Sequence, residues 1–123
     1  PAAPAARDGD LLSRLAYRVA ARLVRALAVH DAVPAALRGL LRGLLHEEGG
    51  PVWAWLSDEQ PTAAFVAERS AWLAVLAEHE HYELATRHEQ EGESAKAAVE
   101  RRLARQAAVM AQHDEATTEQ LVA

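Results

Sequence analysis

The chain of 123 residues contains no cysteine, which excludes disulfide bonds, thiolate zinc sites and thiol chemistry. It also lacks an apolar run long enough to cross a bilayer, so we predict no membrane span. Neither a glycine-rich phosphate loop nor a nucleophile-elbow motif occurs in it. We therefore favour a non-enzymatic protein over an enzyme and predict no cofactor.

Aromatic residues account for only 5% of the chain, and the β-branched residues that strands prefer are also thin. Alanine is abundant instead, with 29 copies, and half of all residues are hydrophobic. Alanine and leucine favour helices over strands. The composition therefore predicts an all-α fold with closely packed helices.

The net charge of −5 argues against a nucleic-acid partner. The charges are also unevenly distributed along the chain. Residues 1–50 contain seven arginines and five acidic residues, whereas residues 51–123 contain six basic and thirteen acidic residues. Such halves attract each other, either within one chain or between two copies.

The chain opens with alanines and prolines, and we expect residues 1–9 to form a flexible N-terminal tail before a single domain over residues 10–123. A start of this kind is typical of a linker, and also of the segment that follows a removed signal peptide. The compartment therefore stays open between cytoplasmic and exported.

Four segments have helical periodicity and are bounded by capping residues, glycines and prolines. Only Gly92 and Glu93 separate the last two segments, which must therefore form an antiparallel hairpin. We predict a helical bundle of about four helices built on this long hairpin. The expected helices cover residues 10–30, 34–46, 57–91 and 94–121, to within a few residues.

Large apolar residues recur at helical spacing in the third and fourth segments, and we expect these stripes to face each other. Trp72 is expected to anchor the core. Continuing its stripe leads to Glu80 and Glu83, which we expect to pair with Arg102 or Arg105 of the fourth segment. The two stripes are Phe65, Val66, Trp72, Leu73 and Leu76, and Val99, Leu103, Gln106, Met110, Thr117 and Leu121.

The third segment has a second face of small residues, which lets another helix approach closely. One chain of this length has too few helices to cover both faces of so long a hairpin. We therefore predict a homo-oligomer, and more generally an interaction or regulatory module with a possible protein partner. The small-residue face consists of Ala63, Ala67, Ser70, Ala74, Ala77, His81 and Ala85.

Two further groups are candidates for a ligand or partner surface. Trp53 and Trp55 lie in the short apolar connector over residues 52–56. Four arginines form a stripe on the first helix, which is either a solvated face, a docking face for the acidic helix of a sister chain, or an anion-binding surface. These arginines are Arg14, Arg18, Arg22 and Arg25.

A ligand- or metal-sensing bundle is the first alternative function. Glu78 and His81 are spaced i, i+3, and His79 and Glu83 are spaced i, i+4, which are spacings that metal ligands adopt on helices. The two pairs point to different faces, so one ion cannot use all four residues.

A histidine phosphotransfer or dimerisation hairpin is the second alternative. Residues 45–56, which begin Leu-His-Glu-Glu-Gly-Gly-Pro, resemble the phospho-acceptor box of one histidine-kinase dimerisation family. The resemblance covers 12 of the 123 residues. It implies that His46 is the phospho-acceptor and that Glu47 helps to deprotonate its imidazole.

Overall fold

The computed structural model describes residues 16, 19–47, 52–53 and 63–122. Within these ranges the chain forms helices and turns, with no strand, which confirms the predicted all-α fold. None of the described helices is both long and apolar enough to cross a membrane. The chain divides into two compact units, Pro1–Pro61 and Thr62–Ala123. The predicted single domain over residues 10–123 spans both units, and the predicted tail lies outside the described residues.

In the first unit, residues 19–28 are helical and α2 covers Ala35–His46. Pro34 occupies the position before the first turn of α2, so the helix begins one residue later than the expected residue 34. Arg42 of α2 is buried, and its Nε donates a hydrogen bond of 2.9 Å to the carbonyl of Ala28. Since Ala28 ends the preceding helix, this cation meets a helix carbonyl that lacks an intrahelical partner.

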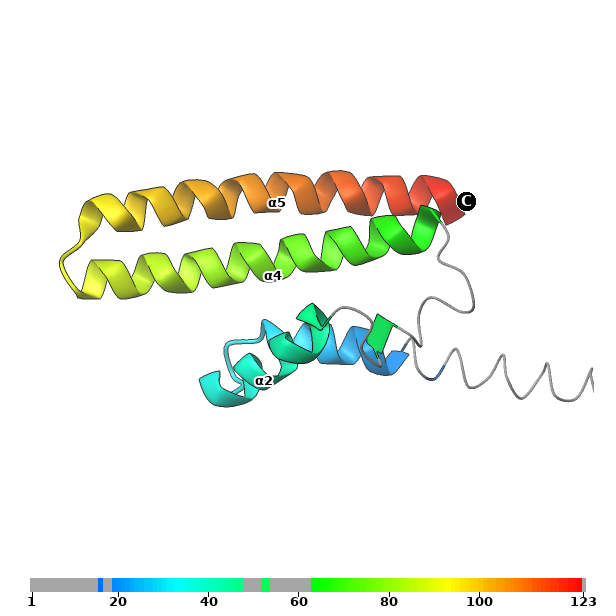
Figure 1. The fold of residues 1–123 in the computed structure, drawn as a ribbon, viewed down its shortest axis with the longest axis horizontal. Coiled ribbons are helices and arrows are strands. Elements are labelled where there is room, and N and C mark those ends of the chain that lie inside the picture. Colours follow the sequence, from blue (N-terminus) through cyan, green and yellow to red (C-terminus); the bar gives the residue numbers. More distant parts are fainter. Residues whose placement is uncertain (1–15, 17–18, 48–51, 54–62, 123) are drawn as a thin grey trace, which may run out of the picture. The chain divides into compact units, whose positions relative to one another are not determined.

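The second unit is the predicted antiparallel hairpin, in which α4 (Ala63–Gln90) and α5 (Ser94–Val122) lie side by side (Figure 1). The helices contain 28 and 29 residues, which at 1.5 Å per residue corresponds to about 42 Å each. The predicted start of the third helix, at Ser57 or Asp58, lies outside the described residues.

The turn between these helices is a Schellman motif. Gly92 has φ +76°, its N–H donates to the carbonyl of Glu89, and the N–H of Glu93 donates to the carbonyl of His88. These two bonds satisfy carbonyls at the end of α4, and the left-handed residue reverses the chain. The carbonyl of Glu93 then accepts the N–H of Ala97, so Glu93 precedes the first turn of α5.

We expect Gly92→Ala to lower the free energy of unfolding by about 1 kcal/mol, because an L side chain disfavours this left-handed conformation. An added Cβ would meet no atom within 4 Å, so the backbone conformation alone accounts for the cost. Chemical denaturation monitored by circular dichroism measures the change. Gly92→Asn is the control, since asparagine tolerates the left-handed region, and an equal loss in both variants would contradict this account.

The hairpin closes along a seam of alanines. In α5, Ala97, Ala104 and Ala111 recur at intervals of seven residues, and each is at most 5% exposed. In α4, the buried alanines are Ala71, Ala74 and Ala85. Because these side chains are short, the two backbones can approach more closely than leucine-packed helices do.

Polar bonds between side chains of the two helices show which face of α5 meets α4. We call these bonds cross-links. Ala97 lies four residues after Glu93 and three before Glu100, so all three share one face of α5. Both glutamates bond to histidines of α4, and the alanine face is therefore the face that α5 turns toward α4. The cross-links are His81–Glu100 (2.5 Å), His88–Glu93 (3.0 Å) and Ser70–Asp114 (2.5 Å).

The predicted phase of α5 is therefore wrong. The large apolar residues that we expected to face α4 are exposed, among them Val99 (54%) and Met110 (59%). The small-residue face of α4 that we assigned to another copy is instead occupied by α5, through Ser70 and His81. Small residues line the contact because close helix packing leaves no room for leucine or methionine.

The apolar residues that we expected to form one stripe on the third helix differ in their exposure to solvent. Trp72 and Leu76 are buried, at 2% and 0% exposure, which confirms Trp72 as a core residue. Phe65 and Leu73 are half-buried, and Val66 is exposed. Besides the histidine–glutamate pairs, Arg101 of α5 forms an ion pair with Glu89 of α4.

Candidate functional site

The outer stripe of α5 is the main exposed apolar feature of the hairpin. We use this name for Val99, Leu103, Val109, Met110 and Leu121, which are between 37% and 68% exposed. Val99, Leu103 and Met110 follow the i, i+4, i+11 spacing of one helix face. An open groove lined by Arg102, Arg105, Gln106 and Val109 adjoins the stripe.

The charges of α5 divide along its length. Its first twelve residues, 94–105, contain four basic residues and one acidic residue. Residues 106–122 contain three acidic residues and no lysine or arginine. The helix therefore has a basic first half and an acidic second half, and its apolar stripe runs through both.

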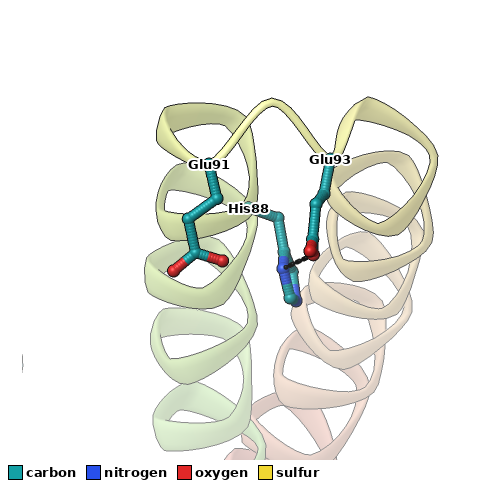
Figure 2. A group of neighbouring side chains, drawn as sticks. All are labelled: His88, Glu91 and Glu93. Atoms are coloured by element: carbon teal, nitrogen blue, oxygen red, sulfur yellow. Dashed lines mark hydrogen bonds and ion pairs between the residues drawn. The ribbon is translucent and has the colours of Figure 1, made fainter.

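The hairpin turn brings together a second group of polar side chains. His88, Glu91 and Glu93 each offer one ligand-type atom, and these atoms all lie within 4.8 Å of one another. His88 and Glu93 meet between the two helix ends, with His88 Nδ1 3.0 Å from Glu93 Oε2 (Figure 2). Within the described part of the chain, this is the group of three such residues that comes close enough to hold a metal ion.

Lys96 also contacts this group, with its Nζ 3.2 Å from Oε2 of Glu93. Its hydrogen bond and charge hold the pKa of the Glu93 carboxyl below its ordinary value, with a smaller contribution from His88, against a partial loss of solvent around the carboxyl. The carboxyl of Glu93 is therefore ionised at neutral pH and accepts bonds from two neighbours.

The four residues of the predicted metal pairs lie elsewhere on α4. His79 Nδ1 is 2.9 Å from the carbonyl of Val75, and His81 is bonded to Glu100 across the seam. Glu78 is half-buried and Glu83 is exposed. None of the four belongs to the converging group at the turn, and a metal role for them stays a prediction.

The predicted tryptophan surface is only partly described. Trp53 is 4% exposed, and its indole N–H donates a bond of 2.6 Å to the carbonyl of Leu45. Its polar atom is therefore engaged within the chain, and a surface role would require the side chain to leave this position. Trp55 lies outside the described residues.

The remaining predicted residues belong to the first unit. Arg22 is exposed and Arg25 is half-buried on the helix over residues 19–28, whereas Arg14 and Arg18 lie outside the described residues. His46 is the last residue of α2 and is exposed. Histidine is favoured at helix C-termini by the helix dipole, and a phospho-acceptor role for His46 stays a prediction.

Sequence reasoning did not predict the group at the turn or the exposure of the outer stripe. One signal for the turn was present: Gly92 follows His88 at the distance that a Schellman motif requires, which places residues 88 and 93 together.

Comparison of the chain with protein-family models, with curated proteins and with solved structures found no match.

Proposed function

We propose that this protein is a non-enzymatic helical interaction module, and that it self-associates through the outer stripe of α5. The observation that carries the proposal is the position of the large apolar residues of α5. They point away from the seam with α4, and Val109 and Met110 are 68% and 59% exposed. Exposed apolar side chains favour burial against a second surface, by about 25 cal/mol for each Å² removed from water.

The distribution of charge favours a second copy of α5 as the occupant. When two such helices pack antiparallel, the basic half of each lies beside the acidic half of the other. Arg102 and Arg105 of one copy then approach the half that contains Glu115 and Glu119 in its partner. A parallel pair would instead place like charges side by side, which disfavours that alignment. Antiparallel pairing is compatible with a twofold dimer, in which both copies use the same surface.

We expect sedimentation velocity to show a dimer whose population falls when Leu103 or Met110 is replaced by glutamate. Each substitution places a charge on the apolar stripe, where dimer formation would bury it without a partner. Added salt is expected to weaken the wild-type dimer, because it screens the attraction between the two halves of α5.

Val66→Glu is the matched control, since Val66 is 58% exposed on α4 and does not belong to the stripe. This variant is expected to dimerise like the wild type. A compact wild-type monomer at tens of micromolar would refute self-association. A dimer that Leu103→Glu and Met110→Glu leave intact would refute the outer stripe as its interface.

A further inference from the structure

We propose that the hairpin turn binds one divalent transition-metal ion of the zinc class through His88, Glu91 and Glu93. The inference goes beyond self-association and does not depend on it. It starts from the backbone: two hydrogen bonds and the left-handed Gly92 fix the end of α4 and the start of α5 relative to each other. The ligand residues therefore lie on a turn with one defined conformation.

The occupants of two key positions distinguish this turn from an ordinary Schellman motif. In that motif, the residue three before the helix end and the second residue after it commonly make an apolar contact. Here those positions are His88 and Glu93, whose side chains meet at 3.0 Å between the helix ends (Figure 2). The place of an apolar contact is therefore taken by one nitrogen and one oxygen ligand type.

The distances suit a small ion. With metal–ligand bonds of about 2.0–2.1 Å, two ligands of a tetrahedral ion lie about 3.4 Å apart. His88 and Glu93 are already close to that separation. Glu91 is the third ligand, and its atom lies within 4.8 Å of both. Because Glu91 is exposed, its side chain can rotate by the remaining ångström or so without disturbing a packed contact.

The ligand set also selects the class of ion. An imidazole nitrogen with two carboxylates suits zinc and neighbouring transition metals, whereas calcium and magnesium prefer sites made wholly of oxygen. Three protein ligands leave a coordination position for water. We therefore expect Zn²⁺ to bind more tightly than Mg²⁺ or Ca²⁺.

Lys96 provides a built-in competitor for the ion. Its ammonium lies 3.2 Å from Oε2 of Glu93, the same oxygen that contacts His88. A metal ion bound to that oxygen must displace the ammonium, since two cations cannot share it without repulsion. Removing the positive charge of Lys96 is therefore expected to strengthen metal binding at the turn. A loosely bound ion elsewhere on the surface would not respond to this residue.

The test is isothermal titration of the tag-free protein with Zn²⁺, followed by histidine ring signals in nuclear magnetic resonance. We expect one ion per chain and a selective shift of the His88 ring signals. His88→Ala and Glu91→Gln are each expected to weaken binding by about tenfold or more. Lys96→Met, which keeps the length of the side chain, is expected to tighten binding several-fold.

His79→Ala is the control, because His79 lies on the same helix and outside the group. Its affinity for Zn²⁺ is expected to equal that of the wild type. The proposal is overturned if no saturable binding occurs, if His88→Ala and Glu91→Gln both bind like the wild type, or if Lys96→Met weakens binding. Loss of binding in His79→Ala instead would identify an adventitious ion on α4 and would also overturn it. None of these substitutions touches the outer stripe, so sedimentation of the same variants separates this proposal from self-association.

Discussion

Replacement of Trp72 by alanine is expected to lower the free energy of unfolding by about 3–5 kcal/mol, the largest effect of any single substitution that we predict. The side chain is only 2% exposed and is among the largest fully buried groups in the described part of the chain. Its removal loses the transfer free energy of an indole and leaves a cavity that the surrounding backbone can fill only in part. Urea denaturation monitored by far-ultraviolet circular dichroism measures the change.

Tyr82→Ala is the control for this substitution. Tyr82 is an aromatic residue on the same helix, but it is 43% exposed. Its replacement is expected to change the free energy of unfolding much less, because little apolar surface leaves the interior. If Trp72→Ala and Tyr82→Ala had equal effects, the assignment of Trp72 to the core would be wrong.

Replacement of Ala104 by leucine is expected to lower the free energy of unfolding by about 1–3 kcal/mol, although leucine is the more hydrophobic residue. Ala104 is fully buried in the middle of the seam, between Ala97 and Ala111. Three additional carbon atoms at this point must push α4 and α5 apart or enter a strained rotamer. Thermal denaturation by calorimetry measures the loss as a lower melting temperature.

Ala98→Leu is the matched substitution, since Ala98 lies on the same helix and is exposed. Alanine and leucine have similar helix propensities, so the free energy of unfolding of this variant is expected to stay within about 0.5 kcal/mol of the wild-type value. A stabilised Ala104→Leu variant would show that the seam has space for a larger side chain, and would contradict close packing through alanine.

The sequence was sufficient to predict the class of the fold, the hairpin and its turn. Glycine at residue 92 stops one helical pattern just before another begins, and two long helices joined by so short a turn can only run antiparallel. Accordingly, α4 ends at Gln90 and α5 begins at Ser94, each within a residue or two of the expected boundary.

The helical periodicity of the sequence did not predict the rotation of α5 about its axis. Periodicity identifies a face of large apolar residues and a face of alanines, and it does not decide which of them meets the neighbouring helix. We assumed that the larger residues are buried first. The structure favours the alanines, because they allow the two backbones to approach and the polar cross-links of His81 and His88 to form.

The group at the turn could not be found by a search for helical spacing. Residues three or four apart share a helix face, and that rule led us to His79 and Glu83. His88 and Glu93 are five residues apart, a separation that a continuous helix does not bring together. The left-handed conformation of Gly92 makes them neighbours, so the pair depends on the turn and not on the helix.

The regular spacing of Ala97, Ala104 and Ala111 has a geometrical consequence for the whole hairpin. A contact that repeats every seven residues averages about 3.5 residues per turn, slightly fewer than the 3.6 of a straight α-helix. Two helices keep such a contact along their length by winding around each other with a left-handed supercoil. The hairpin is thus modular in units of seven. Deleting one such unit from each helix would shorten the hairpin and keep its layers in register, whereas deleting five residues would rotate the alanines beyond the deletion out of the seam.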